Sequence, residues 1–147
     1  MKIDETLLWS HYADEHRGLC LTYKIPMSFL KGKIIGAQHV NYPPEPLAEF
    51  LKTCPTEPEE FIRKLLRIYL TTKSPAWEYE KEARIIGKRH GILDIPKNFI
   101  KEICFGLRTP QPDIDLVTRL ARDYCNCDNF SQMIRDETEF GLTMKKL

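Results

Sequence analysis

The chain has 147 residues, of which 42% are hydrophobic and 29% are charged. This length and composition exclude a disordered chain and predict a single globular domain over residues 1–147. Its 22 Lys and Arg residues balance 21 Asp and Glu residues, which gives a formal net charge of +1. Such a balance excludes a nucleic-acid binder that works through bulk positive charge.

The sequence also predicts a cytoplasmic protein with no membrane segment. No apolar run approaches the roughly 20 residues of a membrane span. Acidic residues stand near the start of the chain, where a secretory signal would carry positive charge. Five scattered cysteines do not form a disulfide framework, so we expect reduced thiols. Cys125 and Cys127 are the one close pair, and C-x-C alone is too weak a pattern to predict a metal site.

The first third of the chain predicts one helix and two strands. A helix capped by Asp4 or Thr6 is expected to run to about residue 17, with Gly18 as a left-handed stop. Residues 19–25 alternate as a strand does, and Leu19, Leu21, Tyr23 and Ile25 share one of its faces. Residues 33–42 predict a second strand that is weakened or bulged at Gly36.

Residues 56–71 give the clearest helical pattern. Thr56 and Glu59 are spaced as a capping box, and Pro58 falls in the first turn. Apolar residues recur at helical spacing and predict a face packed into the core. These residues are Phe61, Ile62, Leu65, Leu66, Tyr69 and Leu70.

The remaining segments complete an α+β protein. Strands are expected at about 80–87, 92–95, 99–106, 129–136 and 140–147. A second helix is expected over residues 113–124, with a buried face of Ile114, Val117, Leu120, Ala121 and Tyr124. The prediction is a mixed or largely antiparallel sheet flanked by a few helices.

Residues 9–18, WSHYADEHRG, are the first candidate site. On a helix Trp9, Tyr12 and His16 share one stripe. His11 and His16 are five residues apart, so the spacing of a two-histidine zinc site is absent. His11 or Tyr12 is suited to donating a directed hydrogen bond to a ligand. The alternative is a structural helix anchored by its aromatic residues.

Residues 77–86, WEYEKEARII, are the second candidate site. Strand periodicity places Trp77 on one face and Glu78, Glu80, Glu82 and Arg84 on the other. One interpretation is a solvated edge strand whose charges prevent further pairing. The other is a carboxylate pair, Glu80 and Glu82, facing a cleft with an aromatic wall.

Four blocks in a fixed order carry a family resemblance. They are WSHYADEHRG (9–18), VNY (40–42), KSPAWEYEKEAR (73–84) and IKEICFG (100–106). With these blocks the chain resembles a bacterial domain family of unknown function. Members of that family usually carry a further N-terminal part, so the chain is expected to be truncated at its N-terminus relative to them.

The segment EKEARII is also similar to the E-x-E strand of ADP-ribosyltransferases, which use NAD as a substrate. This resemblance implies that Glu82 stabilises an oxocarbenium-like transition state and that Glu80 orients the acceptor. It implies that His11 and Tyr12 hold NAD. Further candidates for substrate binding are Trp9, His16, Trp77 and Arg84.

Three functions therefore stay open. The first is an enzyme acting on a nucleotide-type substrate, most concretely NAD. The second is a hydrolase or nuclease that uses His11 or His16 with Glu82, together with Mg²⁺ or Mn²⁺. The third is a non-enzymatic binding or regulatory module of a defence or toxin system. Capture of Glu80 and Glu82 by Arg84 and other basic groups, with no adjacent cleft, would favour the third.

Overall fold

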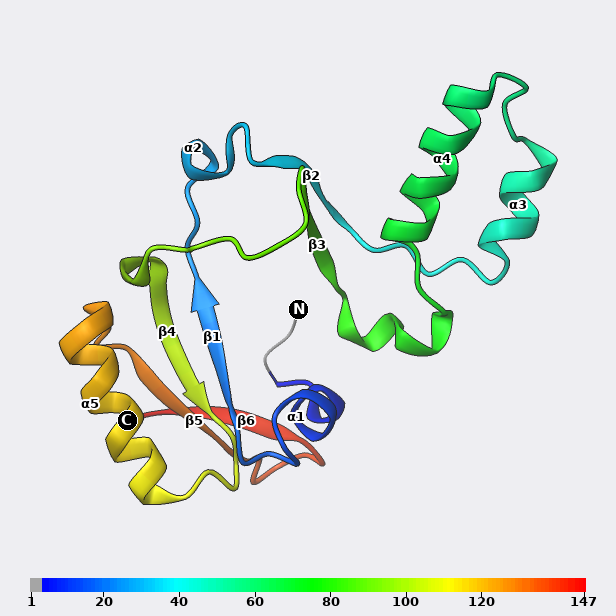
Figure 1. The fold of residues 1–147 in the computed structure, drawn as a ribbon. Helices are drawn as coiled ribbons and strands as arrows, with labels where there is room; N and C mark the ends of the chain where they lie inside the picture. The colour runs from blue at the N-terminus through cyan, green and yellow to red at the C-terminus, as the bar shows by residue number, and fades with distance from the viewer. Residues whose placement is uncertain (1–3) are drawn as a thin grey trace. The chain divides into compact units, whose positions relative to one another are not determined.

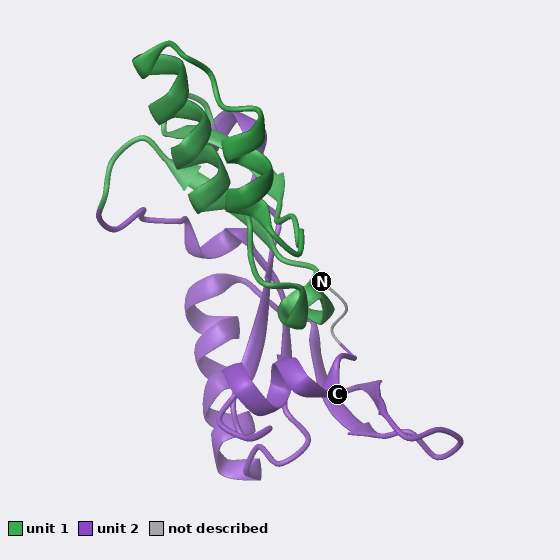
Figure 2. Cartoon of the chain, turned by 90° about the vertical axis from the view of Figure 1, so that its right-hand side faces the viewer, with its two compact units in different colours: residues 1–2, 31–90 green, residues 3–30, 91–147 purple. Residues whose placement is uncertain are grey.

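The computed structural model describes residues 4–147, and these fall into two compact units (Figures 1 and 2). Unit 1 is Lys31–His90. Unit 2 combines residues 4–30 with Gly91–Leu147. Each unit mixes helices with strands, which confirms the predicted α+β class.

Unit 1 has a two-stranded antiparallel sheet and a pair of helices. Strands β2 and β3 pair with Ala37 opposite Ile85, and the register shifts between Ile34 and Gly36. That irregularity confirms the bulge predicted at Gly36. The elements in chain order are β2 (Ile34–His39), α3 (Pro46–Lys52), α4 (Pro58–Thr71), the 3₁₀ helix η1 (Pro75–Glu80) and β3 (Ala83–Gly87).

Helix α4 differs from the predicted core helix in two ways. It begins at Pro58 with Glu57 as its N-cap, and no side-chain cap bond forms, so the predicted capping box is wrong. Phe61 contacts Phe50 of α3, with ring centroids 5.2 Å apart. The flank beside Phe61 is nevertheless exposed. Ile62, Leu66 and Tyr69 keep 56%, 53% and 79% of their surface in solvent.

Unit 2 has a four-stranded mixed sheet in the order β1-β4-β5-β6. The β1–β4 and β5–β6 pairs are antiparallel, and β4–β5 is parallel. Helix α5 forms the crossover between the two parallel strands, as a parallel connection requires. The elements are α1 (Thr6–Tyr12), β1 (Leu19–Tyr23), α2 (Met27–Leu30), the 3₁₀ helix η2 (Lys97–Phe99), β4 (Ile100–Phe105), α5 (Gln111–Cys125), β5 (Phe130–Arg135) and β6 (Leu142–Lys146).

Strand β4 carries the core of unit 2 on both of its faces. Ile103 and Phe105 pack with Phe130 and with Ile114 of α5. Cys104, which points the opposite way, packs with Trp9 of α1, with Ala13 just after α1, and with Met133 of β5. Because side chains alternate along a strand, a single buried strand supports a helix on each face of the sheet.

The helix predicted to run to residue 17 ends at Tyr12. Asp14, Glu15 and His16 follow with φ of 45°, 51° and 71°, all in the left-handed region. The predicted stop at Gly18 is therefore wrong, because the chain reverses before it. The His16 amide donates to the Trp9 carbonyl at 3.1 Å, which closes this reversal.

Three further expectations are corrected by the structure. Strand β3 begins at Ala83 rather than at residue 80, and residues 92–95 form no strand. Leu120 and Tyr124 are exposed on α5, although Ile114 and Ala121 are buried as predicted. Both tail strands are confirmed as β5 and β6. Within residues 4–147, every helix is too short or too polar to cross a membrane.

Candidate functional site

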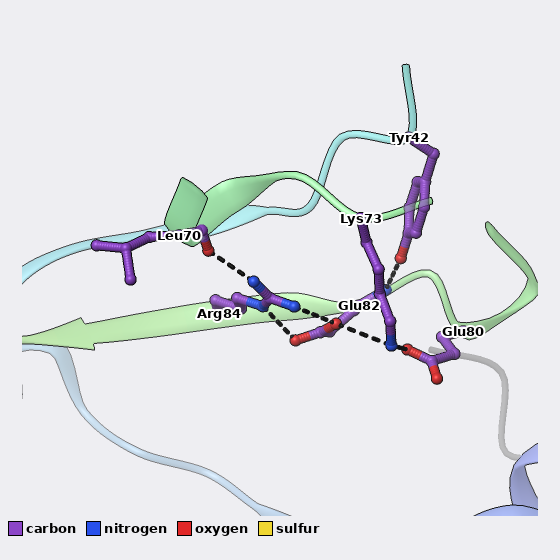
Figure 3. A network of polar contacts seen from close by, with 6 residues as sticks. All are labelled: Tyr42, Leu70, Lys73, Glu80, Glu82 and Arg84. Carbon is purple, nitrogen blue, oxygen red and sulfur yellow. Dashed lines mark hydrogen bonds and ion pairs between the residues drawn. The ribbon is translucent and has the colours of Figure 1, made fainter. Parts of the chain in front are cut away.

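The predicted carboxylates of unit 1 lie in a compact polar network, which we call the carboxylate cluster (Figure 3). Its members come from segments far apart in the sequence. They are Tyr42 after β2, Lys73 after α4, Glu80 at the end of η1, Glu82 just before β3, and Arg84 within β3.

Backbone pairing brings these segments together. Asn41 forms a parallel bridge with Thr72, in which the Lys73 amide donates to the Asn41 carbonyl at 3.0 Å. The Glu82 amide donates to the Tyr42 hydroxyl oxygen, also at 3.0 Å. These bonds fix Lys73 and Glu82 on either side of the segment that leaves β2.

Local conformation sets the direction of the two glutamates. Pro75 stands in the first turn of η1, where its missing N–H costs no helical hydrogen bond. Lys81 ends η1 with a left-handed φ of 45°. The chain therefore turns between Glu80 and Glu82. Strand periodicity does not apply before Ala83, so the predicted row of glutamates on one strand face is wrong.

Glu80 is buried, with 5% of its surface exposed. Its carboxylate accepts a hydrogen bond from Lys73 Nζ, within an ion pair. The same ammonium lies 3.6 Å from Glu82 Oε2 and 4.6 Å from the Trp77 ring centroid. A buried carboxylate requires such a partner, because desolvation of an unpaired charge is costly. For Glu80 the solvated edge-strand interpretation is therefore wrong.

Glu82 is held by the guanidinium of Arg84. Arg84 Nε donates to Oε1 at 2.5 Å, and Nη2 donates to Oε2 at 3.1 Å. The Arg84 hydrogen bond is the main cause that lowers the pKa of Glu82, and charge from Arg84 and Lys73 adds to it. Glu82 is thus ionised at neutral pH and is unsuited to donating a proton as a general acid.

The cluster as a whole balances two carboxylates against two cations. Arg84 also donates from Nη1 to the Leu70 carbonyl at 2.8 Å, so all three guanidinium nitrogens bind groups of unit 1. Trp77 and Tyr79 lie beside the cluster with ring centroids 5.9 Å apart. The arrangement fixes the end of α4 against β3, and it directs the carboxylate oxygens toward protein cations.

The histidine block is placed in unit 2. Trp9 is buried against Cys104 and Met133, which is the structural role that the sequence left as an alternative. Ser10 Oγ lies 3.0 Å from His16 Nε2, a contact that the chain reversal makes possible. His16 Nδ1 is buried without a hydrogen-bond partner within residues 4–147.

The other two predicted ligand contacts of this block lie on the outside of α1. His11 and Tyr12 are exposed and contact each other edge to face, with ring centroids 6.5 Å apart. They therefore point away from the buried side of the helix, which Trp9 occupies.

The predicted site residues thus form two groups. Glu80, Glu82, Arg84 and Trp77 are brought together in unit 1, and the second group lies in unit 2: Trp9, His11, Tyr12 and His16. That these groups make one NAD site stays a prediction.

Sequence reasoning missed three contributors to these groups. Lys73 and Tyr42 lie inside the blocks that carry the family resemblance, yet their roles as partners of the glutamates were not predicted. Ser10 was not assigned as the partner of His16. Across residues 4–147, no three His, Cys, Asp or Glu side chains gather as metal ligands would.

The fold and the clusters define an α+β protein with a charge-balanced polar network in one unit and a Trp-anchored helix turn in the other. The chain belongs to the DUF2971 family, described as a protein of unknown function, and the match covers residues 8–85. This range contains every member of both groups. No curated protein and no solved structure matches the chain.

Proposed function

We propose that the chain is a non-catalytic protein-binding module, in which the carboxylate cluster is structural and helix α4 presents the binding surface. The first part rests on charge. A carboxylate that stabilises a developing cation must turn uncompensated negative charge toward the substrate. Glu82 instead places its oxygens against Arg84 and Lys73, and Glu80 is buried against Lys73.

The second part rests on the apolar stripe of α4, which is the observation that carries the proposal. Ile62, Leu66 and Tyr69 stand at i, i+4 and i+7 and are more than half exposed. Isolated apolar side chains are common on protein surfaces, whereas a contiguous exposed row is typical of an interaction site. At this spacing the three side chains lie on one face of α4, where they can contact one face of a partner helix.

Charge beside the stripe specifies the partner. Arg63 and Arg67 follow Ile62 and Leu66 by one residue, and both are exposed on α4. They form a basic row parallel to the apolar one. The complementary partner is an amphipathic helix of another protein, with an apolar face bordered by Asp or Glu.

Binding of two designed helical peptides to the full chain tests this surface. Both peptides carry the same leucine face, and one is bordered by Glu and the other by Lys. We expect tighter binding of the Glu peptide, measured by calorimetry, and a loss of roughly tenfold or more in Leu66→Asp. Leu116→Asp, at an exposed position of α5, is the matched control and should bind as the parent does.

Two results would overturn the proposal. Equal binding of both peptides, or binding that Leu66→Asp leaves unchanged, would show that α4 is not the binding surface. Nicotinamide release from NAD by the parent chain, lost in Glu82→Gln while the variant stays folded, would establish catalysis at the carboxylate cluster instead.

A further inference from the structure

Two cysteines that are distant in the sequence lie directly opposite each other in unit 2. Cys20 of β1 pairs with Cys104 of β4 in the antiparallel register. Both thiols are free, and both side chains belong to the core cluster beneath Trp9. They therefore point to the same face of the sheet, toward α1.

The pairing pattern sets their separation. The Gly106 amide donates to the Gly18 carbonyl at 2.9 Å, so this pair is of the hydrogen-bonded kind. Hydrogen-bonded and non-hydrogen-bonded pairs alternate along an antiparallel ladder, which makes Cys20 and Cys104 the next hydrogen-bonded pair. Cα atoms in such a pair are about 5.5 Å apart, which lies within the Cα range of disulfides, and the Cβ atoms must move closer together for the bond to form.

We propose that Cys20 and Cys104 form a redox-sensitive site, at which a peroxide converts the two thiols into a disulfide that joins β1 to β4. The proposal is independent of the binding surface on α4. It assigns a reaction to a thiol pair that the sequence presents as two unrelated residues.

The reaction proceeds in two balanced steps. The Cys20 sulfur attacks one oxygen of hydrogen peroxide, the O–O bond breaks, and a sulfenic acid and one water form. The Cys104 sulfur then attacks the sulfenic sulfur, the S–S bond forms, and a second water leaves. Overall the two thiols lose two hydrogen atoms and the peroxide is reduced to water. Cys20 reacts first, since it is half-buried and Cys104 is fully buried.

The surroundings make this a slow site that responds to pH. Burial raises the pKa of both thiols, and the charge of Glu102 raises it further. The pair lies in an apolar cluster with Trp9, Met133 and Leu142. The polar groups at Cys104 are the Phe105 carbonyl, to which its thiol donates at 3.7 Å, and the Ser131 hydroxyl, which lowers its pKa in part. Since the thiolate is the nucleophile, oxidation should accelerate as pH rises.

The full chain carrying Trp77→Phe provides a specific readout, because Trp9 is then the remaining tryptophan of the two. After treatment with hydrogen peroxide we expect an intact mass lower by two hydrogen atoms and a cross-linked peptide containing Cys20 and Cys104. Trp9 fluorescence should change in step, and dithiothreitol should restore it. The rate should be higher at about pH 9 than at about pH 7.

Two variants make the experiment decisive. Cys20→Ser, at the half-buried position, should abolish the cross-link and the reversible Trp9 signal. Cys54→Ser removes a thiol of unit 1 and should leave both unchanged. The proposal is overturned if peroxide links Cys125 to Cys127 instead. It is equally overturned if Cys20 proceeds to sulfinic acid with no link to Cys104.

Discussion

Arg84 donates hydrogen bonds to both carboxylate oxygens of Glu82, from Nε to Oε1 at 2.5 Å and from Nη2 to Oε2 at 3.1 Å. Its third nitrogen, Nη1, donates to the Leu70 carbonyl in the last turn of α4 at 2.8 Å. One guanidinium therefore connects the end of a helix to the start of a strand. The rigid fork of arginine suits this arrangement, and a lysine in its place would supply a single point of charge.

A double-mutant cycle should measure this connection. Arg84→Met, Glu82→Gln and the double variant are compared with the parent by urea unfolding. We expect a coupling free energy of about 1 kcal/mol, since the pair is bidentate and partly buried. The matched cycle uses Glu59 and Arg63 on the exposed surface of α4, where a solvated i,i+4 pair should couple by only about 0.3 kcal/mol. A coupling free energy of zero between Arg84 and Glu82 would contradict a structural role for the pair.

The lowered pKa of Glu82 predicts a specific dependence of stability on pH. A carboxylate whose pKa is lower in the folded state stabilises the protein above the unfolded-state pKa of 4.5. That contribution is lost as pH falls from this value through the folded-state pKa. The free energy of unfolding should therefore fall more steeply below about pH 5 in the parent chain than in Glu82→Gln. Parallel curves for the two proteins would contradict the assignment.

Gly106 is expected to be intolerant of a side chain. A Cβ at this position would lie 2.1 Å from the His16 carbonyl oxygen and 2.6 Å from its carbon. Gly106→Ala must displace the backbone of the chain reversal, and we expect a loss of roughly 2–3 kcal/mol of unfolding free energy. Gly141→Ala is the control, because a Cβ there meets nothing within 4 Å. Equal stability of the two variants would show that the His16 turn moves freely.

The left-handed residues before Gly18 predict opposite effects for two substitutions of Glu15. Glu15 has φ of 51° and an exposed side chain, so its backbone dominates the outcome. Glu15→Gly removes the left-handed strain and should keep or raise stability, by up to about 1 kcal/mol. Glu15→Val adds a β-branched side chain and should lower it. Thermal unfolding of both variants separates them, and the reverse order would exclude the left-handed conformation.

Much of the fold follows from local pattern. The strand-like segments 129–136 and 140–147 are found as β5 and β6, and helical spacing predicts α4 and α5. The short helices α2 and α3 were missed, since four and seven residues carry too little periodicity. The structure contains two compact units, and the predicted single domain over residues 1–147 stays a prediction.

Local sequence pattern does not predict the conformation of the candidate site. Glutamates at alternate positions 78, 80 and 82 fit a strand face, yet Pro75 and Lys81 produce a 3₁₀ helix and a left-handed turn. Glu82 and Arg84 are close because they are two residues apart. Glu80 is paired with Lys73, which is positioned by the backbone bridge between Asn41 and Thr72. The sequence pattern within residues 77–86 contains no information about that bridge.

Composition and periodicity are local properties of the chain, and they were sufficient to predict the α+β class and the segments that carry charge. The four blocks in their fixed order carried the family resemblance, which the family match confirms. The tertiary structure alone decided that Glu80 is buried against Lys73 and that Cys20 stands opposite Cys104. It also decided that the α4 stripe is exposed. These facts depend on strand register and on long-range backbone hydrogen bonds, which join residues whose distance along the chain says nothing of their distance in space.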